Sequence, residues 1–139
     1  MKKNFFSFMC KNGGLSHIAL LFFRIAVSFE LLIAHGLKKI GIGVVIAETV
    51  PNPLGLPEFV NQAFAIVANI IMPLFIAMGL FTKIATLPIL AITLTGYFVV
   101  HFNDPIAVKD VPFMYSVCFL FLTIVGPGKY SLDYYFLNK

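Results

Sequence analysis

The chain has 139 residues, of which 60% are hydrophobic and only 12% are charged. Soluble domains carry about 25% charged residues, so this composition excludes an ordinary soluble enzyme and indicates an integral membrane protein. The net charge of +4 comes from cations scattered at the ends of apolar segments, a distribution that gives no indication of a nucleic-acid partner. The length suits a single membrane domain over residues 1–139 in contact with the lipid bilayer.

The first predicted span, at about residues 17–36, is apolar and yet contains charges. Arg24 stands near its middle, Glu30 follows about two turns later, and His35 ends the run IALLFFRIAVSFELLIAH. An insertion scale assigns a charged residue at a helix centre a cost of roughly 2.5–3.5 kcal/mol, whereas each Leu, Ile, Phe or Val returns only about 0.3–0.6 kcal/mol. The segment is therefore a marginal span that needs partner helices. Its charges are either a polar clasp between helices or part of a functional site, and the sequence leaves both interpretations open.

Three further spans follow, separated by segments that cannot continue a helix. Pro51, Pro53, Gly55 and Pro57 exclude a continuous helix across the connector of residues 40–59. A charge-free run, a second apolar run ending at His101, and a shorter run stopped by Gly-Pro-Gly predict spans at about residues 60–81, 84–101 and 111–126. Residues 102–110 are predicted to form a polar loop. The predicted fold is all-α, a four-transmembrane-helix bundle.

The lysines predict the orientation of this bundle. Four spans place both termini on one side, together with the turn at Lys83. That side holds six lysines against three in the two opposite loops, namely Lys2, Lys3, Lys11, Lys83, Lys129 and Lys139 against Lys38, Lys39 and Lys109. The positive-inside rule then predicts a bacterial-type inner (plasma) membrane protein with both termini cytoplasmic.

This topology brings polar side chains together in the outer half of the bundle. At a rise of about 1.5 Å per residue, Glu30 lies about 7 Å and Arg24 about 16 Å below His35. At about 100° per residue, Arg24 shares a face with His35 while Glu30 points about 120° away, so the two charges cannot pair within their own helix. No catalytic residue is identified. The candidate ligand-binding residues are Arg24, Glu30, His35, Asn69, Tyr97, His101 and Tyr115.

Among ligands for such a group, a quinone head group fits best, because it needs one or two hydrogen-bond donors beside an apolar slot. A haem between His35 and His101 is a weaker interpretation, since the sequence offers no second histidine pair. A metal site that adds Glu30 and Asp110 to these histidines lacks any local ligand spacing, and no metal is assigned. No cofactor site is evident in the chain, and a quinone is the one candidate.

Several runs of residues, taken in order, carry a family resemblance. They are RIAVS, AHGLKK, GLFTKIA, VVHFNDP, KDVPFMY and GPGKYSLD. Together they resemble the DoxX family of small four-helix membrane proteins over nearly the whole chain after residue 15. The resemblance implies association with membrane oxidoreductase assemblies, which include the small subunit of a thiosulfate:quinone oxidoreductase.

The chain departs from the family pattern at three positions. Asn69 stands where the second span commonly has an acid, Lys83 where Arg is usual, and Asp110 where Glu is usual. The loss of the second-span acid would affect any proton or quinone chemistry that depends on it. One hypothesis is that Glu30 replaces this acid from the neighbouring helix.

The sequence thus predicts a redox-associated membrane subunit that holds a quinone or another small apolar molecule in the outer half of the bundle. A soluble oxidoreductase partner would supply the electron-transfer cofactor. The alternatives are a small transporter or permeation unit, working as a homo-oligomer, and a non-catalytic assembly subunit. The sequence does not decide among them, nor whether the chain is itself an enzyme.

Overall fold

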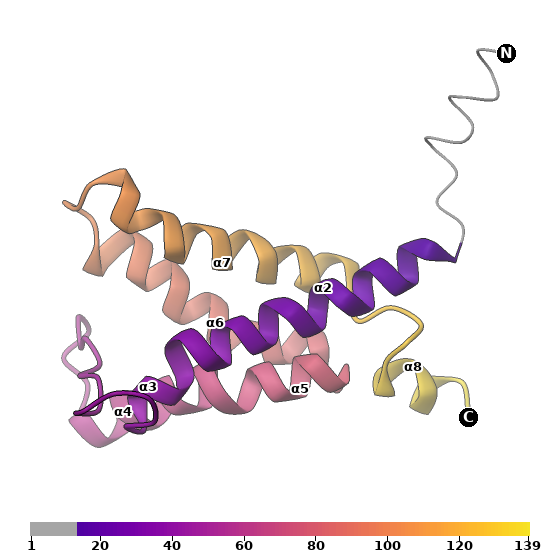
Figure 1. The fold of residues 1–139 in the computed structure, drawn as a ribbon, viewed down its shortest axis with the longest axis horizontal. Helices are drawn as coiled ribbons and strands as arrows, with labels where there is room; N and C mark the ends of the chain where they lie inside the picture. The colour runs from indigo at the N-terminus through magenta and orange to yellow at the C-terminus, as the bar shows by residue number, and fades with distance from the viewer. Residues whose placement is uncertain (1–13) are drawn as a thin grey trace, which may run out of the picture.

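The structure is a computed structural model that describes residues 14–139, and within this range the secondary structure is helical, without strands (Figure 1). Residues 1–13, with Lys2, Lys3 and Lys11, lie outside the described part. Four helices are long and apolar enough to cross a membrane: Leu15–Lys39, Glu58–Met78, Thr82–Val100 and Ile106–Val125. The predicted all-α fold with four apolar helices is therefore confirmed.

Short π-helical turns divide the first three spans. The first consists of α2 (Leu15–Leu31), η1 (Leu32–Gly36) and α3 (Leu37–Lys39). The second consists of α4 (Glu58–Ile66), η2 (Val67–Ile71) and α5 (Met72–Met78). The third consists of α6 (Thr82–Thr95) and η3 (Gly96–Val100), and the fourth is α7 (Ile106–Val125). A short helix, α8 (Leu132–Leu137), follows the last span.

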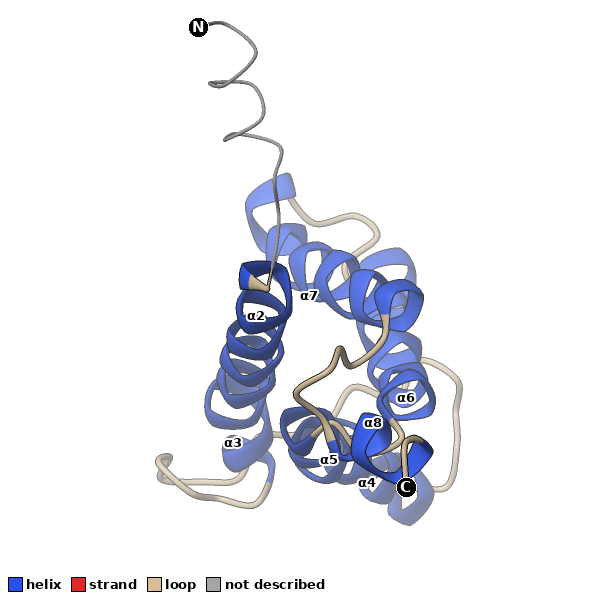
Figure 2. Ribbon diagram, turned by 90° about the vertical axis from the view of Figure 1, so that its right-hand side faces the viewer, coloured by secondary structure: helices blue, strands red, loops and turns tan. Residues whose placement is uncertain are grey.

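The four spans form a ring when viewed along the bundle (Figure 2). α2 packs against α5, α5 against α6, and α6 against α7, which is the most extensive contact, whereas α7 returns to α2 through a much smaller one. The buried apolar core lies between the helices and includes Leu31, Ile76, Ile89, Phe119 and Leu122. The α2–α7 interface is thus the loosest of the four.

The two ends of the bundle differ in what they carry (Figure 1). The start of α2, the turn at residues 79–81 and α8 lie at one end, called here the terminal end. The connector of residues 40–57 and the loop of residues 101–105 lie at the other, called here the loop end, which the lysine distribution predicts to be the outer side. Large apolar side chains such as Phe22, Ile84 and Ile124 are exposed along the spans, where lipid would cover them.

One span boundary differs clearly from the prediction. The fourth span begins at Ile106 rather than at about residue 111, so the prediction of a polar loop is wrong for residues 106–110. Pro105 stands at the N-cap with an extended backbone, from which a helix can start at once. Lys109 is accommodated on this first turn because its long side chain reaches back to the Phe102 carbonyl and lies over the Tyr97 ring.

Candidate functional site

The π-helical turns coincide with three of the predicted site residues. His35 lies in η1, Asn69 in η2 and Tyr97 in η3. Each turn closes with a backbone hydrogen bond across five residues, such as that from the His101 N–H to the Gly96 carbonyl at 2.9 Å. Such turns are rare and occur frequently at functional sites, because they widen the helix locally and re-aim its side chains. Nothing in the sequence analysis indicated them.

Two of these turns touch each other closely. A Cβ atom at Gly36 in η1 would overlap the backbone carbonyl of Asn69 in η2 and would come 3.0 Å from the side chain of Ile70. Asn69 is only 4% exposed, and its amide donates to the Ala65 carbonyl on its own helix at 2.8 Å. Gly36 therefore lets the first two spans approach at this level, and Asn69 lies in their contact.

His35 in η1 and Tyr115 in α7 meet where the first and fourth spans come together, and we include this contact in the α2–α7 interface. Their ring centroids lie 5.4 Å apart with the planes at 88°, an edge-to-face arrangement. Both residues are half-buried, and Tyr115 also stacks at 6.3 Å on the core residue Phe119. Glu30 lies on the exposed side of α2 within electrostatic range of both rings. Of the predicted residues, His35 and Tyr115 are therefore in contact.

Tyr97 and His101 lie at the end of the third span and have separate partners. The Tyr97 ring packs against Phe98 and Phe113, with centroids at 4.9 Å and 5.8 Å. His101 pairs through Nδ1 with the Asp104 carboxylate at 2.7 Å in the loop that joins the third and fourth spans. Among residues 14–139, no hydrogen bond or ring contact joins these two residues to His35 and Tyr115.

Arg24 is placed elsewhere. Its guanidinium is 1% exposed and donates to the carbonyls of Pro127, Tyr130 (2.8 Å) and Ala77 (3.4 Å) at the terminal end. The expectation that Arg24 joins the outer group is therefore corrected. The reason is that the Gly-Pro-Gly segment after α7 folds back onto the bundle and offers its backbone carbonyls to the guanidinium. In this position Arg24 is a clasp between α2, α5 and the chain leading into α8.

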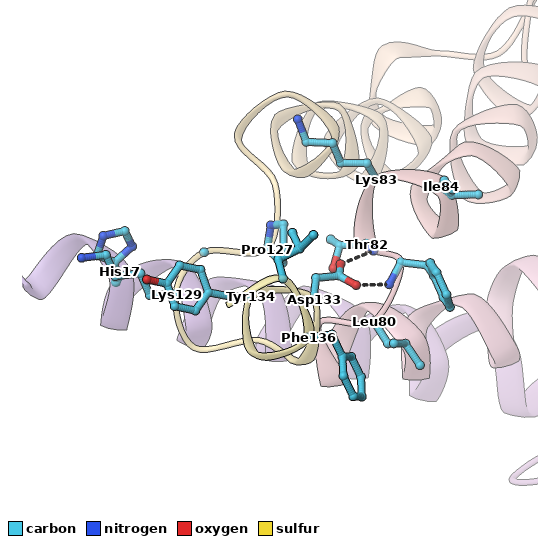
Figure 3. Close-up of a pocket in the computed structure, with 13 residues that line it drawn as sticks. His17, Leu80, Thr82, Lys83, Ile84, Pro127, Lys129, Asp133, Tyr134 and Phe136 are labelled. Atoms are coloured by element: carbon cyan, nitrogen blue, oxygen red, sulfur yellow. Dashed lines mark hydrogen bonds between the residues drawn. The ribbon is translucent and has the colours of Figure 1, made fainter. Parts of the chain in front are cut away.

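A second tie at the terminal end was missed by the sequence analysis (Figure 3). The Asp133 carboxylate accepts from the backbone N–H groups of Phe81 at 2.7 Å and Thr82 at 3.0 Å, where α6 begins. The Asp133 N–H donates to the Gly79 carbonyl at 2.9 Å. A carboxylate at a helix N-terminus is favourable, because it meets unpaired N–H groups and the positive end of the helix dipole. The sequence signal for this contact was an acidic residue, Asp133, in the short segment that follows the last span.

Gly79 allows the start of α8 to pack closely against the end of α5. Its φ of 72° is left-handed, and a Cβ atom there would overlap Ser131 and come 3.0 Å from Nη1 of Arg24. The hydrogen bonds of Arg24 and Asp133 at the terminal end therefore lie in one closely packed region around Gly79.

Comparison with known proteins places the chain in a family. The DoxX family model matches residues 19–102, which is more than half of the chain. The chain belongs to the DoxX family. Together with the four apolar helices, this makes it an integral membrane protein. An uncharacterized protein of Haemophilus influenzae is 29% identical over 133 residues, which cover 89% of this chain and 87% of that protein. No solved structure matches the chain.

The family match covers the first span from residue 19 onward, the second and third spans, and all three π-helical turns. His35, Asn69, Tyr97 and His101 fall inside it, whereas Tyr115 lies beyond it. Among residues 14–139, no three His, Cys, Asp or Glu side chains are grouped so that they could hold a metal ion. The candidate polar groups of this DoxX protein at the loop end therefore include ring nitrogens, phenol hydroxyls, the Asn69 amide and single carboxylates.

Proposed function

We propose that this DoxX protein is a redox-associated membrane subunit that binds a quinone, or another small apolar molecule with a polar head group, in the loop-end half of its bundle. The observation that supports this most is the coincidence of π-helical turns in three spans with the predicted polar residues, next to the His35–Tyr115 contact. The proposal includes a bacterial-type inner membrane, cytoplasmic termini and a loop end that faces outward.

The α2–α7 interface offers the groups that a quinone requires. His35 can donate through a ring nitrogen and Tyr115 through its hydroxyl, which suits the carbonyl oxygens of a quinone head group. The surrounding side chains are apolar, and the interface is the loosest of the ring, so an isoprenoid tail could extend from it into lipid. Ligand pockets of this kind combine an apolar lining with a few polar groups that fix orientation.

Reduction of a quinone consumes protons as well as electrons. Glu30 and His35 would carry protons to the head group, and Lys39 and Glu48 lie within electrostatic range of His35. Asn69, at the position of the family's second-span acid, is buried between the first two spans, whereas Glu30 is exposed on α2. The electrons would come from a soluble oxidoreductase partner that carries the cofactor.

The transporter alternative gains less support from the structure. That alternative requires buried charges along a path through the bundle. Arg24 instead directs its donors at three backbone carbonyls at the terminal end. Both terminal nitrogens of its guanidinium are thereby hydrogen-bonded within the fold.

The proposal is tested by the lipid-soluble molecules that the protein binds. The full chain is purified in mild detergent, organic extracts are identified by mass spectrometry, and binding of a short-chain quinone is measured at equilibrium. We expect a quinone in the extract. We expect His35→Phe and Tyr115→Phe each to weaken binding about twofold to tenfold, because each leaves an aromatic ring at the position and removes a hydrogen bond of about 0.5–1.5 kcal/mol.

His17→Phe makes the same exchange at the terminal end and is the matched control. It should leave quinone binding unchanged. Extracts without quinone, together with no measurable binding by the folded wild-type protein, would overturn the proposed function.

A further inference from the structure

The terminal end contains a recess that the proposed function does not use. It has a volume of about 840 Å³ and lies between the start of α2, the turn into α6, the Gly-Pro-Gly segment and α8 (Figure 3). This volume falls within the range of about 300–1,000 Å³ that is typical of small-molecule sites. We call it the terminal recess. Its basic lining residues are His17, Lys83 and Lys129.

Neither lysine at this recess forms an ion pair with an acid within residues 14–139. Lys129 is exposed and makes no ion pair or hydrogen bond within residues 14–139, and Lys83 has only the Ile124 carbonyl, at 3.3 Å. The acid in the lining, Asp133, directs its carboxylate at the first N–H groups of α6. Figure 3 shows Lys129 beside His17 at one edge of the recess and Lys83 at another. Two lysine ammonium groups therefore remain available to an anion.

The rest of the lining is largely apolar and faces lipid. Leu80, Ile84, Phe136 and Leu137 line the recess, and the last three of these are exposed. Because the recess lies where the membrane-crossing helices end, it sits at the level at which phospholipid head groups meet their acyl chains. A ligand that fits must therefore carry a negative group at the lysines and an apolar chain beside α8.

We infer that the terminal recess binds an anionic phospholipid, with its head group at the edges lined by Lys83 and Lys129 and an acyl chain against Ile84 and Phe136. Basic recesses beside transmembrane helices on the cytoplasmic side are suited to anionic head groups. Tyr134 and Tyr135 on α8 are at the same level, where aromatic side chains favour the interface. The bound lipid would hold α8 and the start of α6 in a fixed position relative to the membrane surface.

The experiment is native mass spectrometry of the full chain in detergent, with phosphatidylglycerol or phosphatidylcholine added at equal concentrations. The wild-type protein should retain phosphatidylglycerol in preference to phosphatidylcholine. Lys83→Gln and Lys129→Gln should each lower the affinity for phosphatidylglycerol about fivefold, which is the effect of about 1 kcal/mol per cation. Replacing both with arginine should preserve the preference, because the charges remain.

Lys139→Gln is the matched control, since Lys139 lies near the same end but does not line the recess. The inference is overturned if Lys139→Gln lowers the affinity as much as Lys129→Gln does, or if the wild-type protein shows no preference between the two lipids. It is also overturned if inorganic phosphate displaces the lipid at millimolar concentration, because the site would then bind a free anion. A negative result here leaves the proposed quinone site untouched, because that site lies at the loop end.

Discussion

The two ends of the bundle use polar side chains in different ways. At the terminal end, Arg24 and Asp133 bond backbone groups that are far away in sequence, and their hydrogen bonds hold α2, α5, α6 and α8 together. At the loop end, His35 and Tyr115 meet only through the edges of their rings, and Glu30 is exposed. Arg24 and Asp133 therefore stabilise the fold at the terminal end, whereas His35, Tyr115 and Glu30 at the loop end keep donors and acceptors for a ligand.

This difference predicts the largest effect for Arg24→Leu. Three carbonyls would lose a charged donor, and hydrogen bonds to charged groups contribute about 1.5–3 kcal/mol each, so we expect the free energy of unfolding to fall by at least about 2–4 kcal/mol. Insertion into the membrane should be unchanged or improved, because leucine is favourable at a helix centre. Membrane-fraction yield measures insertion, and thermal unfolding in detergent measures stability.

Arg24→Lys is the control for this prediction. It keeps the charge and loses the planar fork of donors, so its stability should lie between those of the wild-type protein and Arg24→Leu. An Arg24→Leu protein that unfolds at the wild-type temperature would contradict the assignment of Arg24 as a clasp.

Gly36→Ala tests the contact between the first two spans, with a smaller expected effect. The added methyl group would overlap the Asn69 carbonyl, and overpacking of this kind costs about 1–3 kcal/mol. Because His35 is the preceding residue, displacement of η1 should also weaken quinone binding. Both quantities are measured on the same purified protein, by thermal unfolding and by equilibrium binding.

Gly14→Ala provides the comparison, since a Cβ atom there meets nothing within 4 Å. It should change neither quantity. If Gly36→Ala behaves like Gly14→Ala, the close approach of η1 and η2 is not required for stability or binding.

The sequence was sufficient to predict four helical spans, because the backbone N–H and C=O groups of a long apolar run can be hydrogen-bonded in lipid only if the run is helical. It could not identify the partners of Arg24, since no local pattern states which backbone carbonyls from more than a hundred residues away will fold onto a side chain. The π-helical turns were missed for a similar reason, because they arise where neighbouring helices pack. The start of α7 was different: Pro105 was a usable helix-start signal, but the charges of Lys109 and Asp110 led to the prediction of a loop.

The smallest effect on stability is expected for Glu30→Gln. This variant separates a role of the loop end in binding from a role in folding. Glu30 is exposed and makes no hydrogen bond within residues 14–139, so the free energy of unfolding should change by no more than about 0.5 kcal/mol. Glutamine keeps the shape but cannot exchange a proton. If Glu30 supplies protons at the α2–α7 interface, quinone binding by the variant should lose part of its pH dependence while its stability stays at the wild-type value.

Glu58→Gln is the matched control, because Glu58 is likewise exposed but lies at the start of α4, away from the His35–Tyr115 pair. Binding is titrated across pH 5–8, where carboxyl and imidazole groups at protein sites commonly exchange protons. Coinciding curves for the wild-type protein and both variants would remove Glu30 from the proposed site and leave His35 as its titratable group. A curve altered only in Glu30→Gln would show that an exposed carboxyl at the loop end acts on the ligand, in contrast to the buried Arg24, whose charge serves the fold.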